Sequence, residues 1–162
     1  MNYRTDGNFH TTFIVVLARR MQPAVYLELG VFDGTTFNRV APFCKQVIGV
    51  DIKKQGKYNG TFFEMTTDEF FQKEIEKLPP IELAFIDADH SFDSVRKDFI
   101  GVYSYMAKGG IILLHDTFPE NESYYKPTLC GDCYKMRDWL KDNCYRSITL
   151  PCPPGLTLIE KG

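Results

Sequence analysis

The sequence lacks the features that mark membrane-spanning, secreted and nucleic-acid-coating proteins. None of its apolar runs approaches the roughly 18 residues that span a bilayer, and the first residues show no basic segment followed by a long apolar one. The formal net charge of -2 gives no polycationic surface for nucleic acid. We therefore expect a cytoplasmic protein that acts on small molecules or saccharides, without a membrane or nucleic-acid partner.

The cysteines of the sequence also do not have the pattern of a disulfide framework. The chain has 5 cysteines, an odd number, and 44% of its residues are hydrophobic, which fits reduced thiols around a real core. Cys130 and Cys133 have the spacing of a metal or redox motif, but the sequence places no second pair or histidine close by. Our interpretation is a loop with two incidental thiols, and a zinc or redox role is the alternative.

Short apolar runs alternate with amphipathic segments along most of the chain. Five runs have the character of buried parallel strands: 25–29, 47–51, 61–65, 81–86 and 111–114. Two further runs, 147–150 and 156–160, flank Pro153-Pro154-Gly155 and predict a closing hairpin. The length and composition fit one domain over residues 1–162, so we expect a single α/β domain.

Three helices are predicted in the first half of the chain, one of them over residues 35–43, after the glycine turn and ended near Pro42. Apolar residues recur at helical spacing over residues 9–20, and Pro23 follows that segment. Thr66 with Glu69 three residues later has the pattern of a capping box at the start of another helix. Residues 1–8 are polar, and we expect them to be irregular.

In the second half of the chain, cap residues, glycines and polar stretches predict where helices and loops begin and end. Ser91 is expected to cap a helix whose apolar stripe extends to Met106, and Gly109–Gly110 to turn the chain into the next strand. The polar and aromatic stretch Phe118–Cys130 is too long for a simple connection and is a candidate lid. A helix is expected over about residues 132–143.

The stretch Val25–Phe37 has the pattern of a strand, a tight glycine turn and a helix start. Gly30 and Gly34 free the backbone where it must reverse. The next apolar run ends in Asp51, roughly 20 residues after the first glycine, where adenosine-binding folds place an acid against ribose hydroxyls. With Glu28 before the first glycine, the pattern resembles the first motif of class I S-adenosylmethionine-dependent methyltransferases. The alternative is a strand-to-helix turn that binds nothing.

This resemblance implies a particular fold. Five strand-helix units finished by a hairpin match the Rossmann-like, doubly wound, seven-stranded sheet of class I methyltransferases, which is mostly parallel with an antiparallel C-terminal hairpin strand. It implies a cofactor half at about residues 24–90 and an acceptor half at about residues 91–162.

The charge of the glycine turn distinguishes two adenosine-containing cofactors. A nicotinamide cofactor carries a pyrophosphate that prefers G-x-G-x-x-G, whereas this turn holds Phe32 and Asp33. A sulfonium cofactor with an ammonium group is instead attracted by Glu28 and Asp33. The turn therefore favours S-adenosylmethionine. The expected cofactor contacts are Glu28, Gly30, Phe32, Asp33, Gly34, Thr35, Asp51, Ile52, Met65, Thr66 and Asp87.

Two of the predicted strands are each followed by acids and a histidine. Asp87–His90 follow one strand and His115–Asp116 the next, and the carboxyl ends of parallel strands meet at one edge of a sheet. Such groups can supply oxygen and nitrogen ligands to a divalent ion, of which magnesium or manganese suits best. The alternative is that they cap loops and helix starts through hydrogen bonds.

These two clusters carry a second resemblance. The segment Ala84–Phe92, with its D-x-D-H pattern, and Gly109–Asp116, with G-G-x-x-x-x-H-D, resemble the macrocin-type and cephalosporin-hydroxylase-associated branch of O-methyltransferases. The match covers roughly residues 24–145.

The second resemblance implies roles for individual residues. In metal-dependent relatives the two acids that match Asp87 and Asp116 hold the ion, and the histidine that matches His90 is the base. His115 stands where some relatives have a second acidic ligand, so we include it in the expected metal set. Thr117 departs from the pattern, because catechol-type enzymes have an amide ligand there.

The function that follows is transfer of a methyl group from S-adenosylmethionine to a hydroxyl of a small molecule or sugar, with His90 and Asp87 as catalytic residues and metal assistance. A nicotinamide-dependent oxidoreductase and a non-catalytic cofactor-binding or assembly module of the same fold are the alternatives. Because little of the sequence precedes the first strand, we expect apolar surface near the cleft or sheet edge and a homodimer.

Overall fold

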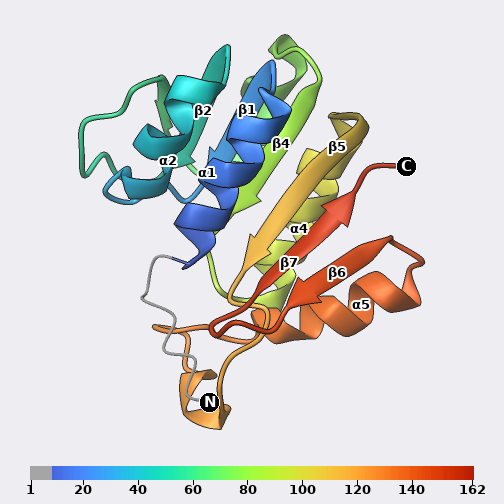
Figure 1. The fold of residues 1–162 in the computed structure, drawn as a ribbon. Helices are drawn as coiled ribbons and strands as arrows, with labels where there is room; N and C mark the ends of the chain where they lie inside the picture. The colour runs from blue at the N-terminus through green and yellow to red at the C-terminus, as the bar shows by residue number, and fades with distance from the viewer. Residues whose placement is uncertain (1–8) are drawn as a thin grey trace.

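The computed structural model describes residues 9–162, and the residues expected to be irregular, 1–8, lie outside that range. Its helices are α1 (Phe9–Met21), α2 (Thr35–Val40), α3 (Thr67–Lys73), α4 (Phe92–Ser104) and α5 (Met136–Asp142) (Figure 1). Its strands are β1 (Val25–Leu29), β2 (Gln46–Asp51), β3 (Thr61–Glu64), β4 (Ile81–Ile86), β5 (Met106–His115), β6 (Ser147–Leu150) and β7 (Leu156–Glu160). No helix within residues 9–162 combines the length and apolarity needed to cross a membrane.

The strands form one 7-stranded sheet in the order β3-β2-β1-β4-β5-β7-β6. Strands β1 to β5 pair in parallel, and β7 pairs antiparallel with both β5 and β6. The chain starts in the middle of the sheet, winds outward to β3, and then crosses back to build the other half. The predicted Rossmann-like, doubly wound sheet with an antiparallel C-terminal hairpin strand is confirmed.

Helices cover both faces of the sheet, and a separate hydrophobic cluster fills each interface (Figure 1). On one face Ile14 and Ala18 of α1 pack with Phe37 of α2 against the sheet. On the other face Phe70 of α3 and Phe99 of α4 pack against it, together with residues of α5. Strand β1, an inner strand of the sheet, is buried along its whole length, as expected for a strand with helices on both sides.

The start signals of two helices are as predicted. Thr66 accepts a hydrogen bond from the Glu69 backbone N–H, and the Glu69 carboxylate accepts one from the Thr66 N–H, which completes the capping box of α3. Ser91 caps α4 by accepting from the Ser94 N–H. These local bonds begin each helix just beyond the carboxyl end of a parallel strand.

The prediction that Gly109–Gly110 turns into a strand was wrong. Strand β5 already begins at Met106, where α4 had been expected to continue, and both glycines lie within the strand. Ile81 of β4 pairs with Met106 of β5, and Leu83 of β4 pairs with Ile111 of β5. Strand β5 therefore has more residues than β4 between these two pairs, and the extra residues form a bulge. The sequence pattern of a glycine turn therefore marked an irregularity inside a strand.

Candidate functional site

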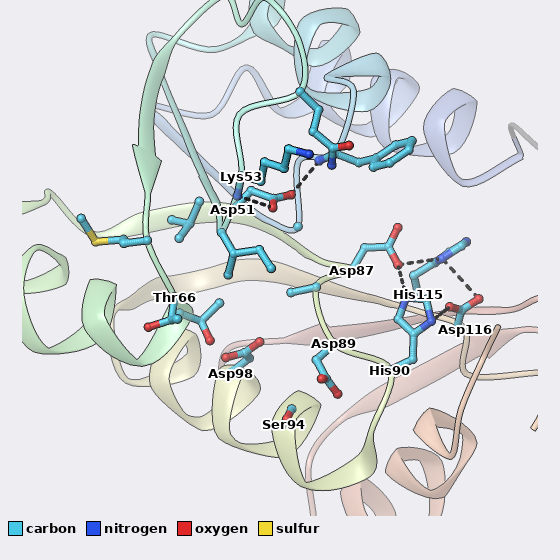
Figure 2. Close-up of a pocket in the computed structure, with 18 residues that line it drawn as sticks. Asp51, Lys53, Thr66, Asp87, Asp89, His90, Ser94, Asp98, His115 and Asp116 are labelled. Atoms are coloured by element: carbon cyan, nitrogen blue, oxygen red, sulfur yellow. Dashed lines mark hydrogen bonds and ion pairs between the residues drawn. The ribbon is translucent and has the colours of Figure 1, made fainter. Parts of the chain in front are cut away.

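A cavity of about 770 Å³ lies at the carboxyl ends of the parallel strands. Residues that follow β1, β2, β4 and β5 line it, together with residues at the starts of α3 and α4 (Figure 2). The lining consists of Gly30, Phe32, Val50, Asp51, Ile52, Lys53, Gln55, Met65, Thr66, Thr67, Asp87, Ala88, Asp89, His90, Ser94, Asp98, His115 and Asp116. This is the edge at which open α/β sheets bind ligands.

Gly30 joins three strands at the cavity wall. Its N–H donates to the Val50 carbonyl at 2.9 Å, and the adjacent Leu29 carbonyl accepts from the Asp87 N–H at 2.8 Å. Gly30 has a φ of 85°, in the left-handed region that favours glycine, and a side chain there would collide with the Asp87 carbonyl. The close approach of β1 to the acid cluster therefore requires this glycine.

Replacing Gly30 by alanine is expected to lower the free energy of unfolding by about 3 kcal/mol or more, since backbone strain and a collision add. Gly109→Ala is the matched control: its φ of 77° imposes strain, but nothing lies within 4 Å of the added carbon. It should cost only about 1–2 kcal/mol. Denaturant titration of both variants measures the difference, and equal losses would contradict the close-approach argument.

Asp51 stands on the cavity wall at the end of β2. Its Oδ2 accepts from the Phe32 N–H at 2.9 Å, and its Oδ1 accepts from the Lys53 N–H at 3.2 Å. A carboxylate has about four lone-pair sites, so both oxygens can still accept from a ligand's hydroxyl groups. The two backbone bonds hold the carboxylate in place as a preformed acceptor.

The predicted cofactor contacts divide between the cavity and its surroundings. Seven of them line the cavity: Gly30, Phe32, Asp51, Ile52, Met65, Thr66 and Asp87. The other four lie outside the lining: Glu28, Asp33, Gly34 and Thr35. Asp33 accepts from the Thr35 N–H at the start of α2, so in this structure its carboxylate serves the turn itself.

Glu28 is buried within the sheet at 1% exposure. The Tyr26 hydroxyl donates to its Oε2 at 2.6 Å. Burial raises the pKa of the Glu28 carboxyl to about 8, although the bond from Tyr26 favours the charged form. Direct attraction of an ammonium group was the basis of the prediction for Glu28, and a buried carboxyl that is mostly neutral at pH 7 supplies little of it.

The two acid–histidine clusters meet at one end of the cavity, as the strand pattern predicted (Figure 2). His115 Nδ1 lies 3.0 Å from Asp87 Oδ1 and 3.4 Å from Asp116 Oδ1. His90 Nδ1 lies 3.3 Å from Asp116 Oδ2, and its Nε2 lies 3.7 Å from Asp87 Oδ1. Two carboxylates and two imidazoles therefore form a single polar group.

His115 and Asp87 behave as an ion pair within this group. Burial alone would lower the pKa of His115, but the Asp87 and Asp116 carboxylates raise it to about 9. The neighbouring histidines in turn hold the pKa of Asp87 below its usual range against the opposing effect of burial. His115 therefore donates through Nδ1 to Asp87, so this ring nitrogen is occupied by the bond to the carboxylate.

Asp87, His90 and Asp116 have the arrangement of a metal site. Each offers one ligand atom, and these atoms lie within 4.8 Å of one another. Oxygen-rich sets of this kind suit magnesium or manganese. The group differs from the predicted set of Asp87, His115 and Asp116 in that His90 takes the place of His115.

The stretch that was predicted as a lid, Phe118–Cys130, touches the centre through its last residues. The Leu129 carbonyl accepts from His90 Nδ1, and just beyond the stretch the Cys133 thiol donates to the His90 carbonyl at 3.2 Å. Because a carbonyl only accepts, Nδ1 carries the proton and Nε2 of the neutral ring keeps a lone pair. Burial raises the pKa values of the Cys130 and Cys133 thiols, so both are uncharged packing groups.

Sequence reasoning missed His10, which reaches the centre from α1. Its ring centroid lies 4.2 Å from that of His115, and its pKa falls to about 4, first through burial and then through the charge of His115. His115 Nε2 is buried without a hydrogen-bond partner among the described residues. Helical spacing was the available signal, because His10 lies one turn before the buried Ile14. The short first helix thus covers part of the site, which the sequence analysis had not assigned to it.

A doubly wound sheet with a glycine turn, a ribose-type acid and an acid–histidine centre defines a class of cofactor-dependent transferases. The family model described as "Methyltransferase domain" matches residues 27–117, which is more than half of the chain and includes the glycine turn, the acid at the end of β2 and the acid–histidine centre. The chain belongs to this family and is a methyltransferase. No curated protein matches the sequence significantly.

Solved O-methyltransferases share the whole fold at low sequence identity. TomG from Streptomyces achromogenes, in complex with S-adenosylmethionine, is 13% identical with a TM-score of 0.70, over 100% of this chain and 84% of TomG. An enzyme from Bacillus cereus, in complex with S-adenosylhomocysteine, is 13% identical with a TM-score of 0.70, over 99% and 84%. MycE from the mycinamycin biosynthetic pathway, with magnesium and S-adenosylhomocysteine, is 16% identical with a TM-score of 0.69, and this chain spans 51% of it. At these identities the likeness shows a common fold.

Proposed function

We propose that this methyltransferase transfers the methyl group of S-adenosylmethionine to a hydroxyl oxygen of a small molecule or sugar. The observation that carries the proposal is one cavity that connects the Gly30 turn and Asp51 to the centre of Asp87, His90 and Asp116. The solved structures of similar fold that bind S-adenosylmethionine or its product support it. Incubation with methyl-labelled S-adenosylmethionine and a panel of hydroxyl compounds tests it.

The cofactor is proposed to lie along the cavity wall formed by the seven lining residues. Asp51 would accept from the ribose hydroxyls, and the backbone at Gly30 allows close approach near the sulfonium end. Ile52 is 74% exposed beside Asp51, and such a large apolar side chain on the wall suits the flat face of a base. Asp33, Gly34 and Thr35 would act by shaping the turn, and the buried Glu28 would make no direct contact with the cofactor.

A divalent ion, magnesium or manganese, is proposed to be held by the Asp87 and Asp116 carboxylates. The mutual proximity of their oxygens with His90 is the structural observation that fits an ion. When bound, the ion supplies Lewis acidity that lowers the pKa of an oxygen beside it. His115 donates to Asp87 and so orients that carboxylate from behind.

His90 is proposed as the acceptor of the proton that leaves the hydroxyl. The Leu129 carbonyl holds the ring through Nδ1, and Nε2, 3.7 Å from Asp87 Oδ1, keeps the lone pair that would accept the proton. The Asp116 carboxylate faces the same ring and stabilises the imidazolium that forms. Alignment of the hydroxyl with the methyl group provides the rest of the rate enhancement.

Two other functions were considered from the sequence. A nicotinamide-dependent oxidoreductase would need its pyrophosphate to fit a turn that carries Phe32 and Asp33. A non-catalytic cofactor-binding module of the same fold would bind S-adenosylhomocysteine without transferring a methyl group to any acceptor. Hydride-transfer assays and the labelled acceptor panel separate both from the proposed activity.

Asp51→Ala is expected to weaken S-adenosylhomocysteine binding by about 1–3 kcal/mol, because hydrogen bonds between a carboxylate and ribose hydroxyls are lost. Isothermal titration calorimetry measures the change. Glu64→Ala, at the end of the neighbouring strand β3 and outside the cavity lining, is the control. Equal affinity of Asp51→Ala and the parent would remove Asp51 from the site.

Two finer expectations stay predictions. One is membership of the macrocin-type, cephalosporin-hydroxylase-associated branch, which the D-x-D-H pattern at Asp87–His90 motivates. The other is a homodimer, for which light scattering should give twice the chain mass of 18.7 kDa. A single-chain mass across micromolar concentrations would contradict it.

A further inference from the structure

Asp98 is a buried carboxyl that the proposed chemistry does not use. It lies on α4, is 3% exposed, and lines the cavity (Figure 2). Ser94, one helical turn earlier, lines the same wall, so this face of α4 is directed at the ligand space. Among residues 9–162, no ion pair includes Asp98. Its hydrogen-bond partner is the side chain of Thr67.

Asp98 lies where the end of the cofactor opposite the sulfonium group is expected to bind. The methyl group must reach His90 and Asp87, so the sulfonium end belongs beside them. Asp51 marks the ribose, and the opposite end of the molecule then falls among Met65, Thr66 and Thr67, where Asp98 also lies. Figure 2 shows Asp98 beside Thr66, with Asp89 between it and the acid–histidine centre.

We propose that Asp98 is a specificity residue whose carboxyl accepts a hydrogen bond from the exocyclic amine of adenine. The inference rests on the proposed cofactor. The Thr67 side chain donates to Asp98, and a carboxyl that is buried without a cation is stabilised further by a second donor at its remaining lone pairs. The amine is the donor that distinguishes adenine from other purines.

The electrostatics of the position fit this role. Burial raises the pKa of Asp98 to about 7, with Asp68 and Asp89 adding to the rise and the Thr67 hydrogen bond opposing it. A neutral carboxyl has both a donor O–H and an acceptor oxygen, and adenine places its N1 acceptor next to its amine. An ionised carboxyl retains the acceptor. Either form therefore accepts from the amine.

The test compares two ligands and four proteins, the parent and three variants, by calorimetry. The ligands are S-adenosylhomocysteine and its 6-deamino counterpart, in which hydrogen replaces the amine and the rest of the base is unchanged. The variants are Asp98→Leu, which has a similar shape but no acceptor, and Asp98→Asn, which keeps an acceptor oxygen. Asp93→Asn is the control, because Asp93 lies on the same helix but its side chain is 76% exposed.

The parent is expected to bind the 6-deamino ligand about 10- to 100-fold more weakly than S-adenosylhomocysteine. Asp98→Leu should bind both ligands with nearly equal affinity, while Asp98→Asn and Asp93→Asn should retain the preference. This pattern isolates the contact between residue 98 and the amine.

Two results would overturn the inference: no preference in the parent, or an undiminished preference in Asp98→Leu. If that variant also loses affinity for both ligands by the same factor, Asp98 has a purely structural role. Thermal unfolding accompanies each titration, and Asp98→Ala replaces the leucine variant if the latter does not fold. If the parent fails to bind S-adenosylhomocysteine at all, the proposed function itself is wrong, and this outcome is distinct from the other two.

Discussion

Replacement of His90 by alanine is expected to lower the turnover rate of methyl transfer about 10²- to 10⁴-fold, the usual contribution of a positioned general base. The affinity for S-adenosylhomocysteine should stay unchanged, because the proposed role of His90 is to take the acceptor's proton. The physical reason is the fixed ring: the Leu129 carbonyl occupies Nδ1, and Nε2 retains the lone pair that a hydroxyl proton needs.

Initial rates with labelled S-adenosylmethionine, together with calorimetric titrations of the product, measure this prediction. Asp93→Asn is a suitable control, since it is also near the start of α4 and loses only an exposed contact with Arg96. A His90→Ala enzyme that turns over at the parent rate would remove the base role. An alanine variant whose main defect is weak Mn²⁺ binding would instead make His90 a metal ligand.

Removal of divalent ions is expected to abolish methyl transfer while leaving cofactor affinity nearly intact, and added magnesium or manganese should restore the activity. The expectation follows from the Asp87 and Asp116 carboxylates, which offer two oxygen ligands at the end of the cavity where the acceptor must bind. Without an ion, a sugar or alcohol hydroxyl remains a poor nucleophile at neutral pH.

Direct Mn²⁺ titration gives a readout that does not depend on turnover. Asp116→Asn should reduce Mn²⁺ affinity by more than the roughly 10- to 100-fold that loss of an outer contact costs. Asp89→Asn is the control, because Asp89 lines the same cavity but is not part of the three-residue group. Full activity of a metal-stripped preparation would sink the metal proposal, and equal Mn²⁺ affinity of Asp116→Asn and the parent would remove Asp116 from it.

Much of the fold was predictable because its signals are local. Apolar runs of strand length, the capping box at Thr66 and Glu69, and the glycines at the end of β1 each depend on a few neighbouring residues. The parallel order then brings Asp51, Asp87 and Asp116 to the same edge by a general rule of open sheets. The prediction of a turn at Gly109–Gly110 failed for a physical reason as well, since glycine is favoured in β-bulges and in turns alike.

The sequence was sufficient for the class of the sheet, the glycine turn and the edge at which the acids gather, because periodicity and strand order determine these features. Folding in three dimensions determined which groups touch and what charge they carry. Glu28 is buried against Tyr26, His10 packs on His115, and Asp98 faces the cavity from a helix that looked like a core element. The protonation of His115 and of Glu28 depends on burial and on partners that lie far apart in the chain, and no local pattern encodes either.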